Sequence, residues 1–502
     1  MPEVPDDEWG PLLEDLVARR EAARAMGGAE KVARHRQAGK LDARARIDHL
    51  LDEGSFHELG TLVGNVAADG IVGGHGAIDG RPVIVGVEDF TVLGGSIGAG
   101  SSAKRYRLAE LAGQERVPLV MVLEGAGHRP PMKGEPAHGR SPVDLQQQAR
   151  LSGRVPVITA VLGASAGHGA LIAPLSDFAI MSAGAAVFTA GPPVVKESLG
   201  EDVSKEDLGG PEVAIGSGLI HNVAATDEAV LDDIRTYLSF FPSSAWSYPP
   251  PAAEAVDIGE RPIEEILEII PRDNARVYDT REVVSLVVDG GSFFQVQPDF
   301  GPAIVCALAH LGGDPVAVVA NQPAVLAGAI DADAADKAAH FIQVADAFHV
   351  PLVFLADNPG VLAGTESERQ GILRAGGRMY AAQTLARTPK LQVTLRKAYG
   401  FGSMVMGMVS FEGQTISAGF PGATLGAMGA RGSSRAVDAD EDRADAIREA
   451  ETNAAYRSAA GLGFDELIDP RELRNVLLRH LRLALNRRQA PAEPRRGSAI
   501  WP

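Results

Sequence analysis

The sequence contains a single cysteine, Cys306, among 502 residues. One thiol excludes a disulfide within the chain and a zinc site built from cysteines. It also fits a reducing compartment, where structural disulfides are rare. The first residues, 1–8, are acidic and contain no apolar run. We therefore expect no signal peptide at this end and predict a cytoplasmic protein.

Long apolar runs and blocks of basic residues are also missing. The most apolar segments, such as Val155–Ala166, are too short and too often interrupted by glycine to cross a bilayer. The formal net charge is −18, and no Lys/Arg block stands among apolar or aromatic residues, so we expect no nucleic acid partner. An acidic chain can still bind an anion locally, through backbone N–H groups and a few Arg or Lys side chains.

No catalytic triad, dinucleotide-binding motif or metal motif is found in the chain. His128, His138 and His168 stand close together in the sequence, but no carboxylate accompanies them at the spacing of metal ligands. No zinc site is predicted.

One pattern is present twice. Val117–Val120 recurs as Val350–Val353, 233 positions later (350 − 117 = 233), and Lys104 precedes Lys337 by the same distance. A chain of this length with 45% hydrophobic residues can bury two or three cores. The repeat predicts two domains of one fold, whose equivalent surfaces can build two related sites.

Short apolar runs, such as Val83–Val87 and Leu119–Leu123, alternate with Gly-rich turns and Ala-rich helical stretches. This alternation predicts an α/β fold. A Pro-rich segment, 242–262, is the best linker candidate. We therefore predict a helical N-terminal arm over 1–50, a first domain over 51–250 and a second domain over 251–502.

Each copy has two Gly-containing loops that follow apolar strands. They are Glu124–Arg129 and Leu162–Gly169 in the first copy, and Asp357–Val361 and Ala398–Ser403 in the second. Small residues let a ligand approach the backbone, and free N–H groups there can stabilise an oxyanion such as an enolate. Such turns also serve tight packing alone in many α/β proteins. Their presence in both copies, where Ala166–His168 is matched with Gly400–Gly402 at 234, favours a binding site in each.

The chain resembles the carboxyltransferase subunit of biotin-dependent acyl-CoA carboxylases, and especially the propionyl-CoA carboxylase β type, over nearly its whole length. The segments that carry this resemblance are Gly39–Leu41, Gly94–Gly98, Phe188–Pro192, Tyr278–Val283, Ala320–Pro323, Asp357–Gly360 and Arg396–Gly400. The resemblance implies two tandem crotonase-like (ββα-spiral) domains. It also implies an active site shared between the first domain of one subunit and the second domain of its partner, in a dimer-based hexamer.

The same resemblance implies an enzyme that moves CO2 from carboxybiotin to the α-carbon of an acyl-CoA thioester. Biotin would arrive on a carrier domain of a separate α subunit, which also serves as the biotin carboxylase partner, and no metal is needed at this step. Enolate intermediates would be held in two backbone oxyanion holes. By resemblance, the amides of Gly167 and His168 form the first hole, and those of Phe401 and Gly402 form the second. Which hole holds which ligand stays open.

Further positions are expected to contact the substrate or biotin. They are Gly127, His128, Gly360, Val361 and Met404. Several positions depart from the family pattern. The family's Ser-Gly-Gly-Ala-Arg loop is here Gly125–Arg129, which introduces His128. In addition, His168 replaces a glycine, Phe401 a small residue, and Met404 an aspartate that influences acyl-chain choice. The His168 side chain would either narrow and polarise the pocket or point away from it. The changes together predict a pocket that is less suited to propionyl groups than to longer or branched ones.

Two alternatives remain beside this hypothesis. One is a biotin-linked acyl-CoA decarboxylase of the same fold, which would run the transfer in reverse from a malonyl-type thioester. The other is a catalytically silent paralogue that scaffolds an active subunit, motivated by the changes at His128, His168 and Phe401.

Overall fold

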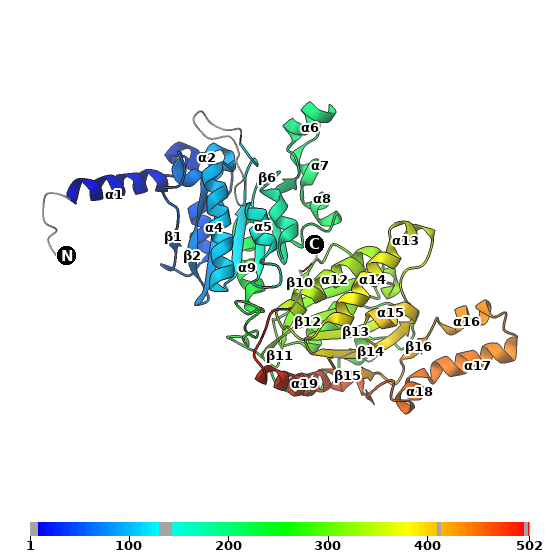
Figure 1. Cartoon of the computed structure of the whole chain (residues 1–502). Coiled ribbons are helices and arrows are strands. Elements are labelled where there is room, and N and C mark those ends of the chain that lie inside the picture. The colour runs from blue at the N-terminus through cyan, green and yellow to red at the C-terminus, as the bar shows by residue number, and fades with distance from the viewer. Residues whose placement is uncertain (1–8, 130–142, 409–412, 496–499, 501–502) are drawn as a thin grey trace. The chain divides into compact units, whose positions relative to one another are not determined.

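The computed structural model describes residues 9–129, 143–408, 413–495 and 500. These residues form two compact units, of which the first ends at Thr236 and the second begins at Tyr237 (Figure 1). Each unit is built around its own large β-sheet, as the repeat predicts. The finer domain limits, 51–250 and 251–502, stay a prediction. Within the described ranges, no helix is long and apolar enough to span a membrane.

The sheet of the first unit has the strand order β1-β2-β3-β4-β5-β7-β9. The strands are β1 His57–Glu58, β2 Ile71–Ile78, β3 Arg81–Glu88, β4 Leu119–Leu123, β5 Val157–Val161, β7 Phe178–Ser182 and β9 Asn222–Ala224. Strands β2 and β3 pair antiparallel, and the pairs from β3 to β9 are parallel. Every residue of β4 is apolar and buried, which is typical of a parallel strand covered on both faces.

Helices and a short second sheet complete the first unit. The helices are α1 Gly10–Arg24, α2 Ala29–Gln37, α3 Ala43–Leu50, α4 Ala99–Glu115, α5 Asp144–Ala149, α6 Pro192–Leu199, α7 Lys205–Gly209, α8 Pro211–Gly216 and α9 Asp227–Ser239, whose last residues belong to the second unit. The short sheet pairs β6 Ala164–Ala166 with β8 Ala186–Phe188. Helix α3 begins where the Asp42 side chain accepts hydrogen bonds from the N–H groups of Arg44 and Ala45, which satisfies donors that the helix itself leaves open.

The sheet of the second unit repeats this plan, with the order β10-β11-β12-β13-β14-β15-β17 and β16 paired to β14. The strands are β10 Phe294–Val296, β11 Ile304–Leu311, β12 Asp314–Asn321, β13 Leu352–Asn358, β14 Lys390–Tyr399, β15 Gln414–Gly419, β16 Thr424–Gly426 and β17 Glu466–Leu467. The helices are α10 Ile266–Ile269, α11 Thr280–Val287, α12 Ala332–Ala347, α13 Thr365–Arg369, α14 Ile372–Leu385, α15 Gly400–Val405, α16 Ala430–Ala436, α17 Glu441–Thr452, α18 Ala454–Ala460 and α19 Leu473–Ala484.

The two sheets correspond residue by residue from β2 to β5 and from β11 to β14. Leu119 pairs with Val157 in the first sheet, and Leu352 pairs with Lys390 in the second. Both positions differ by 233 between the units (352 − 119 and 390 − 157). In each sheet an antiparallel pair leads into parallel strands at the same place. The structure therefore confirms the duplication inferred from the sequence.

Two equivalent lysines are buried on α4 and α12, the helices that follow the antiparallel strand pairs. Lys104 on α4 donates to the carbonyl oxygen of Ile71 at 2.8 Å, and Lys337 on α12 donates to that of Gln297 at 3.1 Å. Burial lowers the pKa of each ammonium to about 8. The hydrogen-bonded carbonyls explain how such groups are accommodated in an apolar interior.

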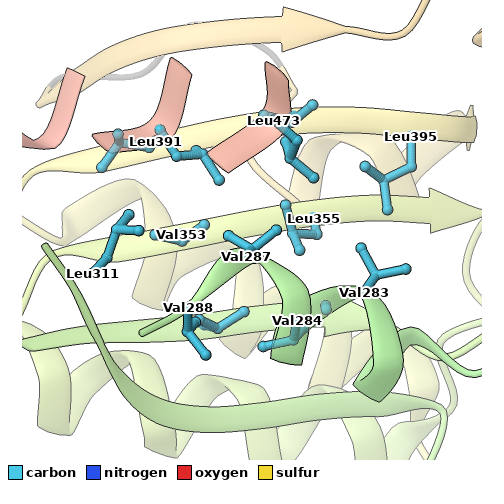
Figure 2. Packing of buried hydrophobic residues seen from close by; sticks show 14 of the residues in the cluster. Val283, Val284, Val287, Val288, Leu311, Val353, Leu355, Leu391, Leu395 and Leu473 are labelled. Carbon is cyan, nitrogen blue, oxygen red and sulfur yellow. The ribbon is translucent and has the colours of Figure 1, made fainter. Parts of the chain in front are cut away.

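One apolar core of the second unit lies between a face of its sheet and helices α11 and α19. Val283, Val284 and Val287 share one side of α11, as the helical period requires, and point toward the sheet (Figure 2). Leu473 of α19 packs into the same cluster, against strands β13 and β14 (Figure 2). The amphipathic patterns of the two helices therefore explain where they dock.

We expect Leu477→Ala to destabilise the second unit by about 2–5 kcal/mol, because Leu477 is fully buried in this core. Leu483→Ala is the matched control, since Leu483 lies on the same helix but is 61% exposed. Denaturant titration monitored by circular dichroism would measure both. Equal losses from the two variants would contradict the packing of α19 described above.

Candidate active site

In the first unit, the loops predicted to form a site meet at the carboxyl ends of β4 and β5. The N–H of Ala166 donates to the carbonyl oxygen of Gly125 at 3.0 Å. The N–H of Ile97 donates to that of Gly127 at 2.7 Å. These bonds join the loops after β3, β4 and β5. Backbone hydrogen bonds therefore hold the three loops of the site together.

Gly127 and Gly167 lie next to each other and both have positive φ, of 81° and 60°. A Cβ on Gly127 would lie 2.9 Å from the carbonyl oxygen of Ala166 and 3.8 Å from the Cα of Gly167. Side chains are disfavoured here both by the backbone conformation and by the space. The structure therefore brings these two predicted site residues together.

The amides of the first predicted hole differ in their availability. The N–H of Gly167 donates to the carbonyl oxygen of Phe188 at 3.1 Å. Among the described residues, no acceptor pairs with the N–H of His168. The His168 amide is therefore the better candidate for binding an oxyanion.

The His168 side chain is held by a carboxylate on α5. Its Nε2 lies 2.5 Å from Oδ1 of Asp144, and the imidazole is 16% exposed while the carboxylate is fully buried. The ring of His128 meets that of His168 edge to face, with centroids 4.7 Å apart. The sequence has no carboxylate at metal-ligand spacing beside these histidines, and the partner of His168 comes instead from α5, 24 positions away in the sequence.

Asp144 belongs to a buried chain of charges. Nε of Arg105 donates to Oδ2 of Asp144 at 2.8 Å, and Nη1 of Arg105 donates to Glu88 at 2.6 Å. Burial alone would raise the pKa of the Asp144 carboxyl, but the hydrogen bond from His168 and the charge of Arg105 lower it to about 2. For Glu88 burial dominates, and its pKa is raised despite Arg105. Asp144 is thus an anion at any pH at which the protein is used.

Histidines can also be metal ligands, and the sequence predicts no zinc site here. In the ranges that the structure describes, no group of three or more His, Cys, Asp or Glu side chains is arranged to hold a metal ion. His138 lies outside those ranges.

In the second unit, the loop after β13 and the turn from β14 into α15 meet in the same way. The N–H of Ile330 donates to the carbonyl oxygen of Gly360 at 3.2 Å, and Ile330 forms a parallel bridge with Val361. A Cβ on Gly402 would lie 2.2 Å from Oδ1 of Asn358 and 2.7 Å from the Cα of Gly360. The predicted residues Gly360, Val361 and Gly402 are therefore gathered at one place.

Phe401 and Met404 lie on α15, beside this contact. The Phe401 ring packs on α14, where a Cβ on Gly376 would lie 2.9 Å from its Cε1 and where the Tyr380 ring is 5.8 Å away between centroids. Met404 is half-buried, and its carbonyl oxygen accepts a hydrogen bond from Gln383 at 3.1 Å. Helix α14 thus sets the position of the aromatic side chain.

The loops of the two units correspond at 233, and the match at 234 predicted for them is wrong by one residue. The bond from Ile97 to Gly127 recurs as the bond from Ile330 to Gly360, each 233 later. In the first unit Gly127 abuts the carbonyl of Ala166, and in the second Gly360 abuts that of Tyr399, again 233 later (399 − 166). His168 is therefore the equivalent of Phe401 (401 − 168 = 233). Runs of small residues carry too little side-chain pattern for the sequence to fix this offset.

A cavity of about 560 Å³ opens in the first unit beside these loops. It reaches Gly94 and Ala164, and its basic lining residues are Lys31, Arg34, His35, Lys40 and Lys205. At its inner side Glu124 is buried and paired with Lys40 at 2.5 Å and with Arg46 at 2.7 Å. The exposed cations of α2 therefore give an acidic chain a local site for an anionic ligand.

No sequence pattern pointed to Asp144, Arg105 and Glu88 as site residues. They come from α5, α4 and β3, and only the tertiary fold brings them to one place. The one available signal was His168 itself, since an imidazole in a loop of small residues calls for a partner.

The chain matches the model of the carboxyl transferase domain over residues 34–498. It is 36% identical to the carboxyltransferase subunit of propionyl-CoA carboxylase from Haloferax mediterranei, over 97% of this chain and 98% of that protein. It is 32% identical to the methylmalonyl-CoA decarboxylase subunit alpha of Veillonella parvula, over 97% of this chain and 98% of that protein. The crystal structure of the transcarboxylase 12S hexamer superposes with a TM-score of 0.89 at 33% identity, covering 99% of this chain and all of that one.

The fold and the paired loops thus define a carboxyltransferase, and the chain belongs to the carboxyl transferase family. Within that family it is similar to propionyl-CoA carboxylase β subunits, as the resemblance implied. The α/β fold with two tandem crotonase-like domains is confirmed.

We expect Gly402→Ala to lower the free energy of unfolding by about 1–3 kcal/mol, because its Cβ has no room between Asn358 and Gly360. Gly377→Ala is the matched control: Gly377 lies inside α14 with no atom within 4 Å of an added Cβ, so alanine should be neutral or stabilise by up to about 1 kcal/mol. Thermal unfolding compares the two. A neutral Gly402→Ala would show that the loops are not in the contact described.

Proposed function

We propose that the chain moves CO2 between carboxybiotin and the α-carbon of an acyl-CoA thioester. The observation that carries this proposal is the pair of equivalent backbone sites, one in each unit, in a chain that belongs to the carboxyl transferase family. In a carboxyl transfer both partners are planar carbonyl compounds whose oxygen gains negative charge. Two sites built from N–H groups suit two such ligands.

Backbone N–H groups in both units can supply the hydrogen bonds that this reaction needs. The N–H of His168 in the first unit and those of Phe401 and Gly402 at the start of α15 would donate to a carbonyl oxygen as it becomes an enolate oxygen. Each lost donor of this kind costs about 3 kcal/mol of transition-state stabilisation in other enzymes. Gly127, His128, Gly360 and Val361 would line the approach. Carboxybiotin would supply the CO2, and the chain would bind and orient the acceptor.

The cavity beside α2 is proposed to take the CoA part of the substrate. CoA carries several phosphate charges, and Lys31, Arg34 and Lys205 present cations around a space of about 560 Å³. The cavity reaches Gly94 and Ala164, so a thioester bound there would extend toward the loops of the first unit. In the second unit, the apolar Phe401 and the flexible Met404 on α15 favour an acyl group with more apolar surface than propionyl, such as a longer or branched one.

The partners follow from the same proposal. The structure of the related 12S protein is a hexamer assembly, and a related mycobacterial subunit is called biotin-dependent. We infer that this chain self-associates, as a dimer-based hexamer, and receives biotin from a separate carrier and biotin carboxylase subunit.

Transfer of labelled CO2 tests the proposal directly. The chain would be mixed with a carrier domain loaded with ¹⁴C-carboxybiotin and with acetyl-, propionyl-, octanoyl- or isovaleryl-CoA. We expect acid-stable label in at least one thioester, and more in the longer or branched ones than in propionyl-CoA. Absence of label in all of them would contradict the proposed function.

A second candidate is the biotin-linked decarboxylation of a malonyl-type thioester, favoured by the relationship to the Veillonella decarboxylase subunit. Methylmalonyl-CoA and free biotin would distinguish the directions. Release of propionyl-CoA without measurable forward transfer would support the decarboxylase, and forward transfer at a higher rate would support the carboxylase.

We expect Arg34→Glu to raise the Kd for propionyl-CoA by about five- to tenfold at low salt, because the variant reverses an exposed charge at the cavity. The difference should shrink as salt screens it. Arg20→Glu on α1 changes the net charge equally at an exposed position outside the cavity lining and should leave Kd unchanged. Isothermal titration calorimetry measures both. Equal effects from the two variants would mean that only net charge matters and would argue against a CoA site here.

A further inference from the structure

The two units differ in one connected set of side chains beside their equivalent loops. Glu88, Arg105, Asp144 and His168 in the first unit correspond, at 233, to Asn321, Ala338, Gly377 and Phe401 in the second. In the first unit these residues form a continuous charged chain. In the second, the equivalent aromatic ring packs on the neighbouring position of α14, Gly376, through apolar contact, and Gly377 itself has no atom within 4 Å of an added Cβ. The second unit therefore serves as an internal reference for what the loops need.

That reference shows that the charges are not needed to build the loops. Oε2 of Glu88 accepts the N–H of Glu124 at 2.8 Å, and Oδ1 of Asn321 accepts the N–H of Asp357 at 3.0 Å. A neutral amide thus performs the structural task of Glu88. Burying Arg105 and two carboxylates is costly compared with apolar residues of the same volume. Stability therefore does not explain this row of buried charges, which ends at the partly exposed imidazole of His168.

The orientation of His168 gives that reason. Nε2 faces the Asp144 carboxylate, which holds a proton on that nitrogen and leaves the lone pair of the neutral ring on Nδ1. Nδ1 is only a few covalent bonds from the backbone nitrogen of the same residue. The N–H that is free to bind an oxyanion and a nitrogen that is free to accept a proton therefore belong to one residue and lie close together.

We propose that His168 is a proton-transferring catalytic residue at the site of the first unit, positioned by Asp144. This inference rests on the proposed function and extends it. Its ligand is a carbonyl compound that loses or gains a proton at the atom beside the carbonyl: the α-carbon of a thioester, or a ring nitrogen of the biotin urea.

The step balances within the chain and its ligand. The lone pair on Nδ1 takes the proton, the C–H or N–H bond of the ligand breaks, and its electron pair moves into the carbonyl group, whose oxygen becomes negative at the His168 amide. The imidazolium formed is paired with the Asp144 carboxylate. The reverse step returns the proton to the same ligand atom. No oxidant, metal or further reactant takes part.

The groups around the imidazole suit this cycle. Asp144 faces it from α5 and His128 from the loop after β4, while Arg105 of α4 and Glu88 of β3 lie one and two contacts further in. The hydrogen bond from His168 and the charge of Arg105 keep the pKa of Asp144 low, so the carboxylate stabilises the imidazolium without taking the proton itself.

Exchange of the α-protons of propionyl-CoA with D2O, without any biotin, tests the thioester case. Proton NMR would follow the wild-type protein, His168→Gly and Asp144→Asn. We expect His168→Gly to slow exchange by about 10²- to 10⁴-fold and added imidazole to restore part of it. Asp144→Asn should cause a smaller loss, on the order of tenfold. The glycine keeps the backbone N–H and matches a residue type that the loop already contains.

The transfer reaction in the complete complex tests the biotin case. Here we expect His168→Gly to lower kcat with little change in KM for the thioester. Added imidazole should restore part of the lost kcat, which a purely structural role of His168 would not allow. His49→Gly is the matched control for His168→Gly, since His49 also bonds an aspartate, Asp232, through Nε2 at 2.9 Å, but on the exposed surface of α3. The control should change neither rate.

The outcomes identify the ligand of the first-unit site and separate the proposal for His168 from the proposed function. Slowed exchange that imidazole restores assigns the thioester to this site. Unchanged exchange with a lower kcat that imidazole restores assigns biotin to it. If His168→Gly leaves both reactions at the wild-type rate, the proposal for His168 is overturned while the proposed function stands. If the wild-type protein transfers no CO2 to any thioester, the proposed function itself fails, and exchange alone then decides the role of His168.

Discussion

The close approach of loop backbones at the carboxyl ends of neighbouring parallel strands is the constraint on which the sites depend. A Cβ on Gly95 would lie 2.3 Å from the carbonyl oxygen of Glu124, and a Cβ on Gly328 would lie 2.3 Å from that of Asp357. Only glycine permits such contacts. Because the strands beneath are buried and rigidly paired, the loops hold their N–H groups in place before any ligand arrives. Preorganised donors of this kind need no rearrangement when charge develops.

On this shared frame the two units place opposite kinds of side chain. The first surrounds its loops with ions that are expensive to bury, and the second fills the equivalent space with a phenyl ring and glycines. Buried ion pairs of this type seldom add net stability, so the first unit has given up stability at this place. An enzyme can tolerate such a loss when the rest of the domain has a large apolar core, as the first unit does.

Much of the fold could be predicted from the sequence, because buried parallel strands such as β4 are continuous apolar runs and because the repeat fixed their order. The glycine loops could be predicted for the same reason, since each follows such a strand. The partner of His168 could not. Asp144 lies on α5, a helix of six residues, and its contact depends on how that helix turns against the loop. The one-residue error in matching the loops arose where small residues leave no pattern of apolar and polar positions to align.

The unbroken offset between the units also bears on how the protein diverged. From β3 to the end of β14, equivalent positions stay 233 apart, so neither half has gained or lost a net residue there since the duplication. An insertion in these loops would move a backbone donor relative to its strand and misplace the oxygen it binds. Length was therefore held fixed while side chains changed. Point substitutions alone are then enough to produce the chemical difference between the halves. They occur at positions where the same backbone accepts either a charged or an apolar side chain.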